Sequence, residues 1–354
     1  MMLAMDDDAT PLRLGFSTGY WSAGPPAGAA EAVAAADRLG LDSVWTAEAY
    51  GSDAFTPLAW WGAGTRTVRL GTGIAQMAAR TPTATAMAAM TLDHLSGGRF
   101  VLGLGASGPQ VVEGWYGQPY PRPLERTREY VDIVRQVLRR EDPVRLDGAH
   151  YQLPLRGGTG QGKALRSTVH PLRADLPIHL AAQGPRNTAL AAEIADGWLP
   201  FLFSPRLSAA YAEHLAAGFA HRAPERSPSS TFEVCAAVPV ALGRDVEQAA
   251  DALRPHFALY IGGMGSGSAN YHREAVERLG HEAACAEIAR RWADGDRPGA
   301  AAAVPTELVL DVALAGSPAQ LREQLAAWEA SVVTTLIIQT DPRVLPDVVA
   351  ALRP

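Results

Sequence analysis

RLGTGIAQM (Arg69–Met77) and RFVLGLGAS (Arg99–Ser107) are the stretches that decide the fold, because each is a short apolar run that predicts a buried β-strand. The residues between them predict a helix. Thr81 is suited to cap its N-terminus, Pro82 to occupy its first position, and the glycines at 97–98 to end it. Strands that are apolar on both faces and joined by a helix are typical of a parallel sheet covered by helices.

The same pattern recurs along the chain. Six more short apolar runs predict strands, at residues 12–17, 43–48, 176–182, 197–203, 232–240 and 333–340. The last of them follows a helix that begins with a capping box, Ser317-Pro-Ala-Gln320. Eight strand–helix units favour a closed (β/α)8 TIM barrel of the α/β class over an open sheet. We therefore expect one barrel domain at residues 11–354, behind a disordered N-terminal tail at residues 1–10.

Two intervals are too long for a simple connection between one strand and the next. Residues 108–175 contain two predicted helices and then a Gly-rich loop, RGGTGQGK (Arg156–Lys163). Residues 243–332 contain helical segments around a second Gly-rich stretch, IGGMGSGS (Ile261–Ser268). Because such excursions usually lie at the C-terminal rim of a barrel, where the chemistry occurs, we expect insertions there.

The composition is that of a globular protein with a large core: of 354 residues, 47% are hydrophobic and 19% are charged. No apolar run approaches the roughly 18 residues that a membrane span needs, and the acidic start of the chain does not resemble a secretory signal. The net charge of −6 and the single lysine, Lys163, argue against a nucleic-acid-binding surface. Cys235 and Cys285 have no partner motif, which favours reduced thiols in a cytoplasmic protein.

Two Gly-rich motifs have partial matches to phosphate-binding loops. Gly103-Leu-Gly105-Ala-Ser-Gly108 has the spacing of a dinucleotide-binding loop, but it follows the fourth predicted strand instead of the first. A ligand phosphate near this turn is a second interpretation, since glycines let the backbone approach an anion. Residues 157–163 match most of a P-loop, but Ala164 stands where Ser or Thr would hold magnesium. This loop either brings Lys163 to an anion or is purely structural.

Single residues also suggest a site. Glu48 stands at the C-terminal end of the second predicted strand, where barrel side chains face the site. Its carboxylate suits a ligand contact or proton relay, or else a structural salt bridge. Tyr20 and Trp21, just after the first strand, suit a pocket for a flat ring, or else the core or a lid. His281 and Cys285 have the spacing of two zinc ligands on a polar helix, but without an evident third ligand we expect no metal site.

Three stretches together resemble the bacterial luciferase-like monooxygenase superfamily. They are LGTGI (70–74), VLGLGASGPQVVEGW (101–115) and HLAAQGPRNTALAAEIADGWLP (179–200). Within the superfamily they look most like the deazaflavin branch of methylenetetrahydromethanopterin reductase and its actinobacterial relatives, which use coenzyme F420. The resemblance implies a (β/α)8 barrel that binds F420, or alternatively FMN, at its C-terminal rim.

The resemblance also implies positions for the cofactor. The ring would lie against a bulge at Thr72, Gly73 and Ile74, with a cis peptide bond between Gly73 and Ile74. The phosphate-bearing tail would lie near Ala106, Ser107, Gly108, Ala182, Gln183, Gly184, Pro185 and Arg186. Lys163 would add positive charge for an acidic tail.

Other positions depart from one branch of the family. Glu48 matches an acidic cofactor contact of related glucose-6-phosphate dehydrogenases. However, Ala49 replaces their catalytic histidine, and Gly108 replaces their acid on the fourth-strand loop. These departures argue against a sugar-phosphate dehydrogenase and leave the proton donor unassigned.

The function that the resemblance implies is hydride transfer between F420 and a small organic carbonyl, imine or conjugated alkene, in actinobacterial secondary metabolism. One alternative is a monooxygenase that uses reduced FMN on the same scaffold. Another is a flavin-binding protein without turnover, since a barrel does not by itself imply activity. We expect a homodimer with a small-molecule substrate and neither a nucleic-acid nor a membrane partner.

Overall fold

The structure is a computed structural model that describes residues 11–264 and 270–353. The predicted tail at residues 1–10 and part of the second Gly-rich stretch lie outside the described residues. Within the described ranges, no helix is both long enough and apolar enough to span a bilayer.

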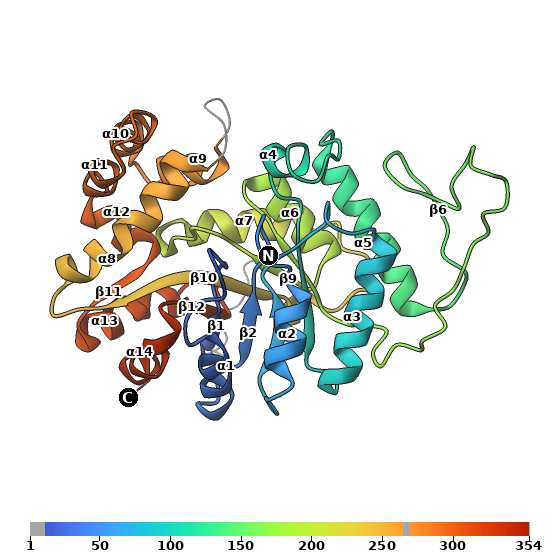
Figure 1. The fold of residues 1–354 in the computed structure, drawn as a ribbon, viewed down its shortest axis with the longest axis horizontal. Helices are drawn as coiled ribbons and strands as arrows, with labels where there is room; N and C mark the ends of the chain where they lie inside the picture. The colour runs from blue at the N-terminus through green and yellow to red at the C-terminus, as the bar shows by residue number, and fades with distance from the viewer. Residues whose placement is uncertain (1–10, 265–269, 354) are drawn as a thin grey trace.

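A closed barrel of parallel strands forms the centre of the molecule (Figure 1). Its strands are β1 (Arg13–Ser17), β2 (Ser43–Thr46), β3 (Arg69–Thr72), β5 (Phe100–Gly105), β8 (Ile178–Ala181), β9 (Gly197–Leu199), β10 (Glu233–Leu242) and β12 (Thr335–Gln339). The barrel closes because β10 pairs with β9 on one side and with β12 on the other, and β12 pairs in turn with β1. The short strand β4 (Ala75–Gln76) continues β3 after a bulge and pairs with β5. All the predicted strands are present, and the (β/α)8 fold class is confirmed.

Helices cover the outside of the barrel, and the two predicted to begin after Thr81 and Ser317 do so. The covering helices are α1 (Ala29–Arg38), α2 (Phe55–Gly62), α3 (Pro82–Ser96), α5 (Pro123–Arg139), α6 (Pro185–Ile194), α7 (Ser208–Phe219), α13 (Pro318–Glu329) and α14 (Leu345–Leu352). The Thr81 hydroxyl accepts a hydrogen bond from the Ala84 amide at the start of α3, and Gly97 ends this helix in the left-handed conformation. Both parts of the Ser317 capping box are formed at the start of α13.

The first excursion divides into two parts. Residues 106–122 follow β5 at the C-terminal rim and include the short helix α4 (Pro109–Val112). Residues 140–177 instead follow the end of α5, and their hairpin of β6 (Leu146–Asp147) and β7 (Gln152–Leu153) extends away from the barrel (Figure 1).

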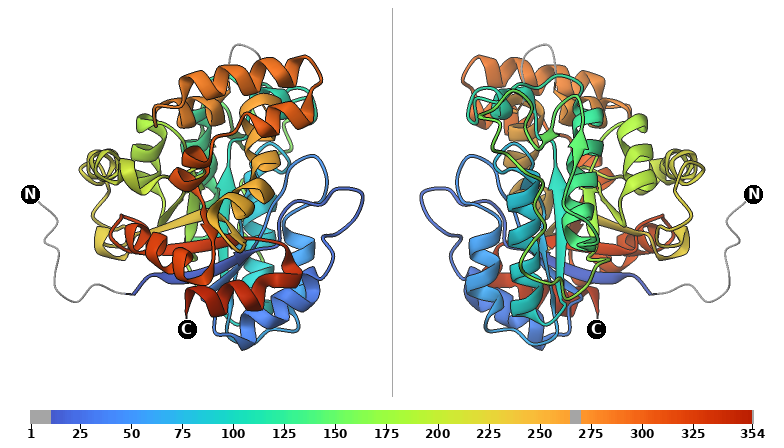
Figure 2. Two further views of the ribbon diagram at one scale, coloured as in Figure 1. Left: turned by 90° about the vertical axis from the view of Figure 1, so that its left-hand side faces the viewer. Right: turned by 90° about the vertical axis from the view of Figure 1, so that its right-hand side faces the viewer.

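The second excursion is almost entirely helical. It contains α8 (Val246–Ala258), η3 (Leu259–Gly263), α9 (Tyr271–Glu277), α10 (Glu282–Ala293), α11 (Arg297–Ala302) and α12 (Thr306–Val312). The strand β11 (Leu314–Gly316) then pairs with the far end of β10, beyond the barrel. Three short 3-10 turns complete the fold: η1 (Pro205–Leu207), η2 (Ser229–Thr231) and η4 (Pro342–Val344). Figure 2 shows α9–α12, in orange, gathered at one end of the barrel.

One large side chain fills the middle of the barrel. Trp45 of β2 is 1% exposed, and its indole N–H donates to the Ser43 hydroxyl at 2.9 Å. The neighbouring strand makes room for the ring with a glycine, since a Cβ atom at Gly71 would lie 2.3 Å from the indole. Because the ring occupies the space that side chains of β3 would fill, the barrel has a packed interior instead of a pore.

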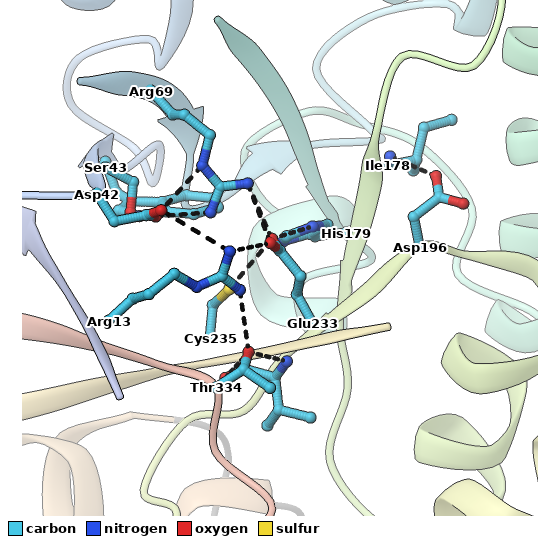
Figure 3. Close-up of polar contacts among 12 residues, drawn as sticks. Arg13, Asp42, Ser43, Arg69, Ile178, His179, Asp196, Glu233, Cys235 and Thr334 are labelled. Atoms are coloured by element: carbon cyan, nitrogen blue, oxygen red, sulfur yellow. Dashed lines mark hydrogen bonds and ion pairs between the residues drawn. The ribbon is translucent and has the colours of Figure 1, made fainter. Parts of the chain in front are cut away.

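Charged side chains gather at the end of the barrel where the strands begin (Figure 3). The Glu233 carboxylate lies 2.7 Å from the Arg13 guanidinium and 3.0 Å from that of Arg69. Arg69 also pairs with Asp42 at 2.6 Å. Two cations and two anions therefore balance one another, next to the buried His179 ring, which lies 3.3 Å from Glu233.

The surroundings of Glu233 favour its ionised form. Burial alone would raise its pKa, but the contacts with His179, Arg69 and Arg13 hold the pKa well below the usual range of a glutamate. A carboxyl group whose pKa is lower in the folded state stabilises the fold above its unfolded pKa, and this contribution is lost as the pH falls.

We therefore predict that Glu233→Gln lowers the free energy of unfolding at pH 7 by about 2 kcal/mol, because it leaves two half-buried arginines with one anion. The difference from the wild type should shrink as the pH falls below about 4, where the unfolded carboxyl is protonated. Urea unfolding across this pH range measures both effects, and the exposed Glu225→Gln serves as control. Equal stability of Glu233→Gln and the wild type at pH 7 would contradict the prediction.

Candidate active site at the barrel mouth

The bulge after β3 is built as the sequence predicts. The peptide bond between Gly73 and Ile74 is cis. The Gly73 amide donates to the Thr46 carbonyl at 2.7 Å, and the Glu48 amide donates to the Ile74 carbonyl at 3.1 Å. These two hydrogen bonds tie the bulge to the end of β2, so that it lies at the C-terminal mouth of the barrel.

Ile74 forms a ledge at this mouth. Its side chain is half-buried and packs on the inner cluster that contains Trp45 and Leu199. A Cβ atom at Gly105 would lie 2.8 Å from Ile74, so β5 makes room for the ledge with a glycine. An apolar ledge supported from below can carry one face of a flat ring.

Thr72 supports the bulge from within the sheet. Its side chain is buried, and its hydroxyl donates to the Gly103 carbonyl at 2.7 Å and accepts from the Gly103 amide at 2.9 Å. Both hydrogen-bonding functions of the hydroxyl are thus used between β3 and β5. The structure places Thr72 beneath the predicted ring position and gives it no surface at the mouth.

The Glu48 carboxylate is part of a buried salt bridge. It accepts from the Gln76 amide at 2.7 Å, and each of its oxygens lies 2.8 Å from a nitrogen of Arg80. Glu48 is 4% exposed. The structural interpretation of Glu48 therefore matches the observed contacts. Sequence reasoning missed Gln76 and Arg80, although both lie in the segment that joins the third strand to its helix.

The loop after β5 has an unusual backbone. Ser107 has a φ of 58°, and its carbonyl accepts from the Tyr120 hydroxyl at 2.8 Å. Burial raises the pKa of Tyr120 to about 12, so this hydroxyl stays protonated and donates. Ala106, Ser107 and Gly108 are all half-buried, and Gly108 directly precedes α4.

The loop after β8 leads directly into α6. Gly184, with a φ of 79°, precedes the helix, and Pro185 is its first residue. Arg186 is exposed beside it. Ala182 is buried, and its carbonyl accepts from the Trp198 indole at 2.9 Å. The first N–H groups of a helix have no partner within it, so this end of α6 can receive an anion.

Gln183 joins this loop to neighbouring segments. Its amide nitrogen donates to the Phe201 carbonyl at 3.2 Å and lies 3.5 Å from Nδ1 of His272. The structure thereby connects the β8 loop to the segment after β9 and to α9 of the second excursion.

Tyr20 and Trp21, which the sequence suggested as the lining of a ring-binding pocket, point in different directions. Trp21 turns to the outside and stacks on Trp61 of α2, with ring centroids 6.0 Å apart. Tyr20 remains at the mouth, half exposed, and its phenol group interacts with that of Tyr260. Of the two residues, the structure leaves Tyr20 as the one that a ligand at the mouth can reach.

Lys163 is placed apart from the other predicted residues. It is exposed and belongs to the connection between α5 and β8, whose hairpin packs on α5 through Glu129. Figure 1 shows this connection extending outward on the side of α5. A contact between Lys163 and the cofactor stays a prediction, because a Gly-rich sequence does not show in which direction its loop leaves the barrel.

Sequence reasoning also missed polar atoms near the strand ends. Oε1 of Gln76, Oε1 of Gln339 and Nε2 of His256 are buried and have no hydrogen-bond partner among the described residues. Buried polar atoms normally have partners, so these three are free to hydrogen-bond water or a polar ligand. Gln76 ends β4 and Gln339 ends β12. Their positions at the ends of predicted strands were the only signal in the sequence.

Two groups of side chains in the described ranges have the composition of a metal site. His179, Glu233 and Cys235 form one group, at the start of the strands. The carboxylate of this group is already paired with two arginines, and burial raises the pKa of the Cys235 thiol. The second group includes Glu129, whose carboxylate accepts three backbone N–H groups of the β6–β7 turn. Both sets of contacts are those of structural interactions.

Comparison with known proteins gives the family. The family model described as luciferase-like monooxygenase matches residues 12–335. A provisionally named coenzyme F420-dependent oxidoreductase of Mycobacterium tuberculosis is 54% identical over 92% of this chain and 94% of its own. A 5,10-methylenetetrahydromethanopterin reductase of Archaeoglobus fulgidus is 28% identical over 86% of this chain and 87% of its own.

A solved structure has the same fold over nearly the whole chain. The F420-dependent tetrahydromethanopterin reductase of Methanopyrus kandleri superposes with a TM-score of 0.80 and 21% identity, over 97% of this chain and 99% of that one. The superposition supports the fold, and the matches of the family model and of the mycobacterial relative show the family. The chain belongs to the luciferase-like monooxygenase family.

Proposed function

We propose that this protein is an F420-dependent oxidoreductase. The observation that carries the proposal is the 54% identity, over nearly the full length, to the mycobacterial protein named for that activity. The related reductases that use methylenetetrahydromethanopterin support it. Three finer expectations from the sequence stay predictions: a carbonyl, imine or alkene substrate, a role in secondary metabolism and a cytoplasmic location.

The residues at the mouth suit the parts of such a cofactor. The Ile74 ledge offers an apolar support for the ring, and the free amide oxygens of Gln76 and Gln339 can accept from its polar edge. The loop at Ser107 and the exposed Arg186 at the start of α6 suit a phosphate-bearing tail. When bound, the deazaflavin supplies hydride chemistry. The chain's own residues bind, orient and exclude water.

Glu48 acts in this proposal as a positioning residue. Its backbone amide holds the Ile74 carbonyl, and its carboxylate holds Arg80 and the Gln76 amide. The residue therefore connects the ledge, the end of β4 and the start of α3. We therefore expect removal of its charge to disturb the positions of Gln76 and Arg80 at the mouth, and to affect the reaction only through that change.

We predict that the protein binds F420 more tightly than FMN, as measured by fluorescence titration. Gly108→Leu should weaken F420 binding about tenfold without unfolding the protein, because a Cβ atom there meets only the end of the flexible Gln110 side chain, at 3.0 Å. Gly64→Leu, at an exposed glycine after α2, is the matched control. Micromolar FMN binding without F420 binding would instead favour the monooxygenase alternative. Binding of F420 without turnover of any carbonyl, imine or alkene would favour a binding protein.

A double-mutant cycle tests the role of Glu48. We expect Glu48→Gln and Arg80→Met each to lower the free energy of unfolding, with a coupling energy of about 2 kcal/mol between them, since the first removes the closest anion of the half-buried Arg80 and the second leaves the buried Glu48 carboxylate unpaired. Urea unfolding of both single variants and the double variant measures the coupling. A Glu48→Gln variant with full stability but without turnover would show that Glu48 acts directly on the reaction.

We also propose a homodimer through α2 and α3. These adjacent helices expose Trp60 (81%), Met87 (60%) and Leu95 (74%) on the outside of the barrel. Large exposed apolar side chains that lie together mark interaction surfaces in soluble proteins.

Trp60→Glu should therefore convert the dimer to a monomer, because a buried carboxylate without a partner opposes association. Size-exclusion chromatography with light scattering measures the mass. Leu155→Glu, at an equally open position on the β6–β7 side, is the control and should leave the dimer intact. A monomeric wild type, or a Trp60→Glu variant that remains dimeric, would contradict the proposed interface.

A further inference from the structure

Four aromatic rings meet above the strand ends and form what we call the mouth cluster: Phe201, His256, Tyr260 and His272. The Phe201 ring centroid lies 4.6 Å from that of Tyr260 and 5.1 Å from that of His272. Tyr260 in turn lies 4.8 Å from His256 and 5.1 Å from His272. Phe201 comes from the loop after β9, and the other three residues come from three elements of the second excursion. Residues that are far apart in the sequence are therefore in contact in the fold.

The mouth cluster spans the barrel mouth. On one side it reaches the loop after β8, because Gln183 contacts both Phe201 and His272. On the other side it reaches the loop after β1, since the phenol group of Tyr20 interacts with that of Tyr260. In the strand order, β8 and β9 are separated from β1 by other strands on both sides. A cluster that reaches the loops after β8, β9 and β1 therefore lies across the opening.

The cluster is also held in place from behind. The Asn270 side chain caps α9 and donates to the carbonyls of Tyr260 at 2.9 Å and Ile261 at 3.0 Å. Tyr260 itself is 6% exposed, whereas Tyr20 and Tyr50 are half exposed beside it. The buried rings thus form a wall, and the two more open phenols form its accessible edge.

The wall is electrically neutral. Burial lowers the pKa of His256 and of His272 to about 4, so both imidazoles are uncharged at pH 7. Two arginines near the mouth are paired with carboxylates: Arg80 with Glu48 at 2.8 Å, and Arg273, the residue after His272, with Glu277 at 2.6 Å.

We propose that the mouth cluster and Tyr20 form the substrate pocket, and that this pocket selects an uncharged, ring-bearing molecule over an anionic one. The proposal deepens the oxidoreductase function and rests on it. Aromatic walls bind flat apolar rings, while phenol hydroxyls and neutral imidazoles hydrogen-bond a carbonyl or hydroxyl oxygen. A carboxylate or phosphate would lose its hydration there without meeting a free cation, which is unfavourable.

The two sides of the mouth would then bind groups of different charge. Arg186 and the start of α6 suit an anionic cofactor tail, whereas the mouth cluster suits a neutral substrate. Gln183 lies between them and is a positioning residue, because its amide nitrogen contacts both His272 and the Phe201 carbonyl.

A matched pair of ketones tests the charge preference. Acetophenone and 4-acetylbenzoate share a ring and a carbonyl group and differ in one carboxylate. We expect calorimetric titration of the protein, with and without F420, to show acetophenone binding roughly tenfold or more tightly than 4-acetylbenzoate. Equal binding, preference for the carboxylate, or binding of neither ketone in either form would overturn the proposal.

Placing a cation in the wall should reverse the selection. His272→Lys should raise the affinity for 4-acetylbenzoate about tenfold relative to acetophenone, because the ammonium group pairs with the carboxylate. His221→Lys adds the same charge at an exposed position after α7 and should leave the preference unchanged. An unchanged preference in a His272→Lys variant that melts like the wild type would overturn the proposal.

A second variant addresses the hydrogen bond. Tyr20→Phe keeps the ring and should weaken acetophenone binding severalfold, whereas Tyr211→Phe, on the outer helix α7, should not. An equal loss of acetophenone binding in both variants would contradict the assignment of Tyr20 to the substrate pocket. F420 affinity, measured separately by fluorescence, decides the oxidoreductase proposal. A protein that lacks F420 binding but prefers acetophenone would therefore contradict that function and leave the pocket standing.

Discussion

The packing of Trp45 inside the barrel is the constraint on which the rest of the structure depends. The indole needs space that only glycine leaves free, as at Gly71, and its presence makes the interior solid. Ile74 rests on the cluster that contains this ring, and the His179 ring lies 5.8 Å from it toward the start of the strands. One buried side chain thus supports the ledge at the mouth and adjoins the charged network at the opposite end.

Charge is distributed unequally between the two ends of the barrel. Where the strands begin, Arg13, Arg69 and Glu233 form close ion pairs whose value is structural. At the mouth, the Glu48–Arg80 pair is buried beside the bulge, and the remaining wall is aromatic and neutral. This separation is consistent with a barrel in which one end maintains the fold and the other binds ligands.

Local patterns in the sequence predicted the features that depend on neighbouring residues. The strands, the Thr81 cap and the Ser317 capping box are all present, because each depends on residues within a few positions. The bulge with its cis peptide bond at Gly73–Ile74, which the family resemblance implied, is present as well. Predictions that depended on the direction of a side chain or loop succeeded less often. Trp21 turns to α2, and Lys163 lies on the outward connection, since neither direction is set by adjacent residues.

The sequence by itself determined the barrel and its family, because hydrophobic periodicity and short motifs are local properties. Only the tertiary structure decided that Glu48 pairs with Arg80, that the Thr72 hydroxyl is used up by Gly103, and that rings from separate excursions meet across the mouth. Those contacts join residues far apart in the chain. Their geometry depends on barrel closure, which the spacing of residues along the sequence does not encode.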